Sequence, residues 1–193
     1  MKKTPIVLAL SLLSSPVFAI TNGTNVDWQN DFDDMVNNHC TGLVVGGDQI
    51  LTALHCSDLT DIAFANGDVV TAPARADHPD YVWSGSGSSY DVSVWTLPQA
   101  AKTQNIHYFA DLNVQNVSIG DEAQAYGFGG NNPLSYATLL IYGLTSHSTD
   151  YIANEISGNV IGGDSGGVWM KDGLIVGDDY RATSEAQTVE FVS

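Results

Sequence analysis

Short runs of apolar and β-branched residues recur along the chain, and turn-forming residues separate almost all of them. Runs of this length, rich in Val, Ile, Thr and aromatic residues and bounded by Gly, Asn, Asp or Pro, are typical of β-strands. Residues 170–173, between two of the runs, indicate a tight hairpin. The predicted strands span residues 42–45, 49–54, 68–72, 92–97, 122–128, 137–142, 167–170, 174–177 and 188–192.

Helical periodicity is nearly absent from the chain. Its apolar residues rarely recur at the three- and four-residue spacing that marks one face of a helix. Many short strands without intervening helices favour an all-β sandwich or barrel over alternating strand and helix units. We therefore predict an all-β fold.

The composition predicts one globular domain with an acidic surface. Of the 193 residues, 44% are hydrophobic and 15% charged, which is too apolar for a disordered acidic tail. Asp and Glu number 22 against 6 Lys and Arg, for a formal net charge of -16. Because nucleic acids and anionic lipids attract proteins through Lys and Arg, we expect neither as a partner. We interpret the acidity mainly as a source of solubility, with a direct role in substrate choice as the alternative.

One acidic cluster is a candidate for metal binding. Asp31, Asp33 and Asp34 lie close together, but their spacing does not match an EF-hand loop. We expect these side chains to be solvated surface residues and predict no metal site.

The first 19 residues have the pattern of a secretory signal peptide. Two lysines precede an apolar run over residues 6–13, which is too short to span a bilayer. Val17 and Ala19 stand at the third and first positions before a cut. We expect cleavage after Ala19 to give a mature domain over residues 20–193, located in the periplasm or outside the cell.

Export to an oxidising compartment permits disulfide bonds. The chain has two cysteines, Cys40 and Cys56, and the simplest interpretation is one bridge that closes a short loop. Two unpaired thiols are the alternative.

A glycine-rich segment over residues 162–167 surrounds Ser165 and reads Gly-Gly-Asp-Ser-Gly-Gly. The pattern Gly-x-Ser-x-Gly also occurs in the nucleophile elbow of α/β-hydrolases, in which the histidine follows the serine. All five histidines of this chain precede Ser165, so the elbow interpretation fails. A serine that transfers acyl groups needs a base, a carboxylate that orients the base, and backbone N–H groups facing the oxyanion.

The segment over residues 40–56 has a cysteine at each end and a Leu-Thr-Ala run shortly before His55. It resembles the trypsin and chymotrypsin family of serine peptidases, in which such a run leads to the catalytic histidine and a disulfide fixes its position. Asp91 begins the apolar run 91–97 and is similar to the family's catalytic carboxylate at the head of a strand. The resemblance implies a triad of His55, Asp91 and Ser165.

Two further features of the family match residues of this chain. Gly163 and Ser165 correspond to the oxyanion-hole residues, whose backbone N–H groups bind the tetrahedral intermediate. The sequence Ile-Thr-Asn-Gly from Ile20 resembles the family's Ile-Val-Gly-Gly, whose new ammonium group pairs with the Asp before the serine. We expect Ile20 to pair with Asp164 directly after export, without a separate zymogen step.

The specificity pocket departs from the family's pattern. Asn159 stands at the base of the primary pocket, where trypsins have Asp, and Gly177 replaces a serine that supports the catalytic carboxylate. Asp178 and Asp179 follow in place of Trp-Gly. A preference for Lys or Arg therefore does not carry over from trypsins. One route that restores it is attraction of a cationic side chain by Asp178 or Asp179 in the cleft.

The resemblance covers the whole mature chain and implies two antiparallel six-stranded β-barrels with the active site in the crevice between them. It implies a secreted, monomeric serine endopeptidase that cleaves protein or peptide substrates without a metal or organic cofactor. Two alternatives remain open. One is a catalytically impaired, peptidase-like binding protein, suggested by the altered cleft, and the other is an esterase that uses the same triad.

Overall fold

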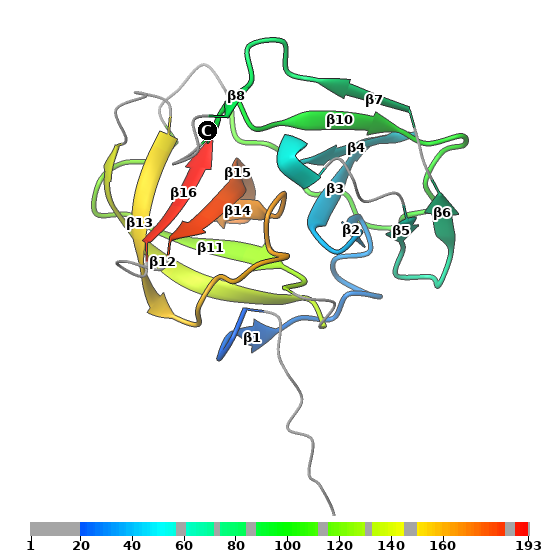
Figure 1. Ribbon diagram of the computed structural model, residues 1–193. Coiled ribbons are helices and arrows are strands. Elements are labelled where there is room, and N and C mark those ends of the chain that lie inside the picture. Colours follow the sequence, from blue (N-terminus) through cyan, green and yellow to red (C-terminus); the bar gives the residue numbers. More distant parts are fainter. Residues whose placement is uncertain are drawn as a thin grey trace, which may run out of the picture.

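The computed structural model describes residues 20–56, 61–71, 74–83, 88–111, 116–129, 133–144, 150–183 and 188–192. The expected signal peptide lies outside these residues. The described regular structure is almost entirely β, in two seven-stranded sheets and a two-stranded ribbon (Figure 1). Within the described ranges the one helical element is η1, a single 3-10 turn over Leu54–Cys56. The all-β prediction is confirmed.

The first sheet lies on the right in Figure 1 and has the strand order β6-β5-β2-β3-β4-β10-β7. All its neighbouring strands are antiparallel. Buried and half-buried residues alternate along β10, as expected for a strand with one face on a core. The strands are β2 (Met35–Asn37), β3 (Thr41–Gly46), β4 (Gln49–Thr52), β5 (Asp61–Ala63), β6 (Val69–Thr71), β7 (Ala74–Asp77) and β10 (Ser93–Thr96).

The second sheet lies on the left in Figure 1 and closes on itself. Its order is β1-β12-β11-β14-β15-β16-β13, and β13 also pairs with β12, so six strands form a ring with β1 added at one edge. The ring matches the six-stranded barrel implied by the sequence. The strands are β1 (Thr24–Asn25), β11 (Glu122–Gly127), β12 (Ser135–Leu144), β13 (Asp150–Ser157), β14 (Val168–Lys171), β15 (Leu174–Thr183) and β16 (Thr188–Val192). The separate ribbon pairs β8 (Val82–Trp83) with β9 (Ser88–Ser89).

Each of the nine predicted apolar runs overlaps a strand. The predicted hairpin joins β14 to β15, and its central residues Asp172 and Gly173 have φ angles of 53° and 78°. Positive φ at both central positions is the geometry of a two-residue type I′ turn. The pattern missed β1, β2, β5, β7, β8, β9 and β13. No apolar alternation marks β7, because every residue of that edge strand is exposed.

Besides a small cluster of Cys40, Ala53 and Cys56, three large apolar clusters hold the described part of the fold together. One lies in each sheet: Trp95 and Ile50 belong to the first, and Trp169 and Leu139 to the second. The third cluster draws side chains from both sheets. Its buried members are Met35, Leu43, Tyr126, Phe128, Leu134, Val168, Met170 and Ile175. The two sheets therefore pack directly on each other through this third cluster.

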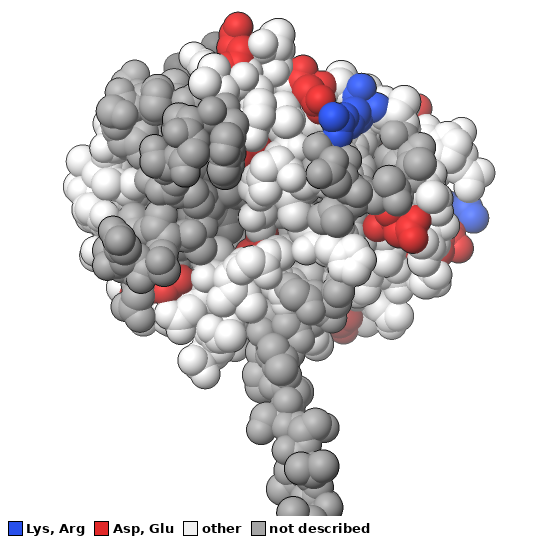
Figure 2. All heavy atoms as spheres, viewed as in Figure 1, with Lys and Arg blue, Asp and Glu red and all other residues white. Residues whose placement is uncertain are grey.

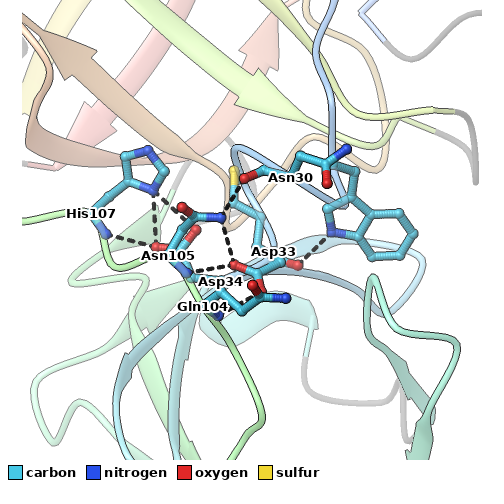
Figure 3. A network of polar contacts seen from close by, with 8 residues as sticks. Asn30, Asp33, Asp34, Gln104, Asn105 and His107 are labelled. Atoms are coloured by element: carbon cyan, nitrogen blue, oxygen red, sulfur yellow. Dashed lines mark hydrogen bonds and ion pairs between the residues drawn. The ribbon is translucent and has the colours of Figure 1, made fainter.

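A polar network fixes the segment that connects the two sheets (Figure 3). Asp33 accepts the backbone N–H groups of Gln104 at 2.6 Å and Asn105 at 2.8 Å. Asp34 accepts the N–H of His107 at 2.7 Å and contacts its ring Nδ1 at 2.9 Å. Asp33 and Asp34 are 7% and 0% exposed, so the expectation of solvated side chains is wrong for both. They are buried because backbone N–H groups of the connection satisfy their carboxylates.

Replacing His107 by Ala is expected to lower the free energy of unfolding by about 3 kcal/mol. The substitution leaves the fully buried Asp34 carboxylate without its imidazole partner. His78→Ala is the matched control: His107 stacks on Phe32 and His78 stacks on Tyr90, but among the described residues the His78 ring bonds an exposed backbone N–H, that of Asp80, and no carboxylate. Urea unfolding measures both variants. Equal losses would contradict a special role for the His107–Asp34 pair.

Acidic side chains are scattered over the face in Figure 2 rather than gathered into one patch. Some of them pair with the few basic residues, as Arg75 does with Asp77 at 3.2 Å. A dispersed charge raises solubility without directing a ligand to one place. On this face the distribution supports solubility as the role of the acidity.

None of the helical structure in the described residues has the length and apolar character needed to cross a membrane.

Candidate active site

His55 and Asp91 come together because the strands that precede and follow them are paired. His55 lies on η1, directly after β4, and Asp91 lies two residues before β10, while Thr52 of β4 faces Ser93 of β10. Asp91 Oδ1 accepts the backbone N–H of His55 at 2.9 Å, and Oδ2 lies 2.7 Å from His55 Nδ1. The carboxylate thus holds both the backbone and the ring of the histidine.

The burial of this pair is asymmetric. Asp91 is 1% exposed, whereas the His55 side chain is 31% exposed. A carboxylate at Nδ1 favours the tautomer with a proton there and leaves Nε2 free to accept one. Burial and the Asp91 charge also raise the pKa of Tyr81. The geometry is that of an oriented general base with one edge open to solvent.

The predicted disulfide between Cys40 and Cys56 is confirmed, with a Cα–Cα distance of 6.2 Å. It joins the residue before β3 to the residue after His55. In the described part of the chain, one set of His, Cys, Asp and Glu atoms lies close enough to hold a metal: Cys40, His55 and Cys56. Its sulfurs are bonded to each other and supply no thiolate ligand.

Ser165 lies in the segment between β13 and β14, against the start of β3, the strand that begins directly after Cys40. Its carbonyl oxygen accepts the N–H of Thr41 at 2.8 Å and lies 3.9 Å from Cys56 Sγ. The segment therefore packs beside η1, which carries His55. Among the described residues no hydrogen bond joins Ser165 Oγ to His55, and such bonds are often long in ligand-free enzymes.

Two glycines allow this segment to approach β3 and β4. Gly163 has φ 103° and Gly166 has φ 78°, a region that residues with a Cβ rarely adopt. At Gly166 a Cβ would also overlap the Thr41 carbonyl oxygen and the Thr52 hydroxyl. These positions explain why Ser165 is flanked by glycine.

Ile20 and Asp164 are also brought together. Asp164 is fully buried and accepts backbone N–H groups from Gly129 at 2.7 Å and Ile161 at 2.8 Å, and the backbone N–H of Ile20 also favours its charged form. Burial raises the pKa of Asp164 to about 6, although the three N–H groups act in the opposite direction. The backbone of Ile20 is thus near enough to act on the carboxylate that the sequence assigns to it.

The family model described as Trypsin matches residues 20–177 of the chain. The chain belongs to the trypsin family. A search of curated protein sequences finds no match.

Solved structures of trypsin-family proteins share the fold at low sequence identity. Neuropsin, a serine protease of mouse brain, is 18% identical, with 90% of this chain and 94% of that chain covered and a TM-score of 0.74. Human heparin binding protein is 13% identical, with 89% and 90% covered and a TM-score of 0.74. A scabies mite inactivated protease paralogue is 14% identical, with 88% and 93% covered and a TM-score of 0.70. Such likeness shows the chymotrypsin-like fold alone.

The predicted specificity residues of this trypsin-family chain lie in two places, just after β13 and on β15. Asn159 follows β13, and its side-chain amide donates to Glu155 at 2.7 Å, while Gly177 and Asp178 lie on β15 opposite β14. Asp178 is only 5% exposed, so its carboxylate is largely shielded from solvent. Asp179 is on the same strand, and its side chain lies outside the described part of the structure.

Two polar residues of the site were missed by sequence reasoning. Thr41 bonds the Ser165 segment through both its backbone and its side chain. Glu155 accepts from the Asn159 amide and from the N–H of Val160 at 2.6 Å. No motif marks either residue, because a Thr or Glu in a strand is ordinary and its role depends on contacts with distant loops.

Proposed function

We propose that the chain is a secreted serine endopeptidase that hydrolyses peptide bonds through an acyl-enzyme on Ser165. The trypsin-family domain already indicates a peptidase with protein substrates. The observation that carries the finer proposal is the buried Asp91 carboxylate, which bonds both the backbone and the ring of His55 beside the Ser165 segment. A serine needs an aligned base of this kind for activation, and the Asp91–His55 pair differs from the similar Asp34–His107 pair in lying beside the Ser165 segment.

The proposed mechanism has two halves, formation of the acyl-enzyme and its hydrolysis, and the same residues act in both. Ser165 Oγ attacks the scissile carbonyl while His55 Nε2 takes its proton, and Asp91 stabilises the imidazolium that forms. The N–H groups of Gly163 and Ser165 bind the oxyanion. His55 then donates its proton to the leaving amine, and water repeats the sequence to release the acid. This chemistry requires no metal or organic cofactor.

We assign the mature N-terminus to Ile20, after signal-peptide cleavage at Ala19. The new ammonium group would pair with Asp164, because the backbone N–H of Ile20 already acts to lower the pKa of that carboxyl. Export to the periplasm or the medium accounts for both the leader and the disulfide. We propose a monomer that binds neither nucleic acid nor membranes.

The pocket residues belong to the same proposal. Asn159, Gly177, Asp178 and Asp179 are assigned to the specificity pocket. A preference for Lys or Arg through Asp178 or Asp179 stays a prediction.

The decisive experiment is intact mass spectrometry of the secreted protein after exposure to a fluorophosphonate, with Ser165→Ala as the control. We expect a mass that begins at Ile20, includes one disulfide and carries one adduct, which Ser165→Ala lacks. A fluorophosphonate reports an activated serine, so the adduct tests Ser165, His55 and Asp91 together. A correctly processed, oxidised protein without an adduct would contradict the proposal and favour a peptidase-like binding protein, because an inactivated paralogue shares this fold.

A further inference from the structure

Thr41, the first residue of β3, contacts both ends of the segment from Gly163 to Ser165. Its backbone N–H donates to the carbonyl of Ser165 at 2.8 Å, and its hydroxyl donates to the carbonyl of Gly163 at 3.0 Å. One residue of the first sheet therefore brackets the three residues that include the proposed nucleophile and both proposed oxyanion donors.

The direction of the Thr41 hydroxyl bond follows from its second partner. The same oxygen accepts the backbone N–H of Phe128 at 2.9 Å, and Thr41 is fully buried. A hydroxyl has one proton to donate, and the N–H of Phe128 can only donate, so the hydroxyl proton points to the Gly163 carbonyl. Each contact of the hydroxyl is thus a satisfied, buried hydrogen bond.

Thr41 is itself anchored to the strand that leads to the base. Its carbonyl accepts the Thr52 hydroxyl at 2.7 Å, and Thr52 ends β4, three residues before His55. Thr41 therefore connects the strand before His55, through its carbonyl, with the Gly163 carbonyl and the Phe128 N–H at the end of β11, through its hydroxyl.

Gly163 depends on such external contacts. With φ 103° and no Cβ, this residue gains little conformational restriction from its own side chain. The Gly163 carbonyl belongs to the planar peptide between Gly163 and Asp164, and the two proposed donors, the N–H groups of Gly163 and Ser165, lie in the peptides on either side of it. Fixing this central peptide at the Gly163 carbonyl, and the chain beyond it at the Ser165 carbonyl, therefore restricts both donors. Oxyanion stabilisation depends on donors that are held in place before the reaction.

We propose that Thr41 is a positioning residue: its hydroxyl holds the segment that carries the two oxyanion donors in place. It touches no reacting atom and acts through the peptide between Gly163 and Asp164, which lies between the peptides of the two donors. The inference rests on the proposed function and deepens it, because it identifies what holds the donors of that same site in place.

The test compares Thr41→Val with Thr41→Ser in the mature, disulfide-bonded protein. Valine keeps the shape but leaves the Gly163 carbonyl and the Phe128 N–H without their partner, whereas serine retains the hydroxyl. We expect valine to lower kcat by about 10- to 100-fold with KM within about threefold, and serine to restore most of kcat, since loss of an oxyanion donor outright costs about 100- to 1,000-fold. Rates are referred to active sites titrated with fluorophosphonate, well below the unfolding temperature.

A second readout separates positioning from general destabilisation. Affinity for a peptide boronate, which forms a tetrahedral adduct, should fall in parallel with kcat/KM in Thr41→Val. An unchanged kcat per titrated site in Thr41→Val, or an equally low kcat in Thr41→Ser, would overturn the role of Thr41. If Thr41→Val does not fold, Thr41→Ala provides the same comparison with a smaller side chain.

The same measurements distinguish failure of the proposed function from failure of the Thr41 role. A folded wild-type protein that takes no fluorophosphonate and hydrolyses no peptide would overturn the peptidase proposal and the Thr41 role together. A labelled, active wild type with an unaffected Thr41→Val variant overturns the Thr41 role alone.

Discussion

Asp91→Asn is expected to lower kcat by about ten-thousand-fold while the protein stays folded, the magnitude that accompanies the wrong histidine tautomer in a Ser-His-Asp triad. An amide nitrogen opposite His55 Nδ1 would donate to it, and the ring proton would then reside on Nε2. In that tautomer His55 cannot take the proton from Ser165. The measurement is kcat/KM on a peptide substrate with urea unfolding in parallel.

The chain contains a matched control for this substitution. Asp34 contacts His107 as Asp91 contacts His55, with one bond to the backbone N–H and one to ring Nδ1, but it belongs to the connection between the sheets. Asp34→Asn should therefore reduce stability and leave kcat within about twofold. A loss below tenfold in Asp91→Asn, or equal losses in both variants, would contradict the assignment of Asp91.

The extent of agreement between sequence and fold depends on burial. Strands with one face on a core, such as β10 and β12, show the alternation that the sequence pattern reveals. The edge strand β7 is exposed at every residue, so nothing in its sequence reports its pairing with β10. The two buried aspartates before β2 were expected at the surface, because their burial depends on N–H donors about 70 residues away along the chain.

The residues of the site also differ in whether the sequence alone could identify them. His55, Asp91 and Ser165 were found because each lies in a local motif or at the head of an apolar run. Thr41 was missed because its partner Gly163 is 122 residues away and only the folded chain brings them together. Motifs thus located the groups proposed to react, whereas the residues that hold them in place became visible only in the structure.

Retaining Ala19 at the N-terminus is expected to make the protein less stable at pH 7 than the form that begins at Ile20. In the retained form Asp164 receives N–H groups but no cation, and burial raises its pKa to about 6 from 3.8. The folded state then binds more protons than the unfolded state between those values, so its stability falls as pH rises from about 4 to about 6. The loss amounts to about 3 kcal/mol.

The processed form should lack this loss. The Ile20 ammonium would pair with the Asp164 carboxylate and compensate for its burial. Urea unfolding of both forms at pH 4, 5, 6 and 7 should show a stability difference that grows with pH. Asp164→Asn, made in both forms, should remove the pH-dependent part of this stability difference.

A smaller, pH-independent difference is expected to remain. Ile20 has φ 37°, a left-handed conformation that costs a β-branched residue about 1–2 kcal/mol. That angle is defined only while Ile20 is joined to the preceding residue, so cleavage removes the constraint. A difference between the two forms that stays constant from pH 4 to pH 7 would contradict the pairing of Ile20 with Asp164 and leave only the backbone effect.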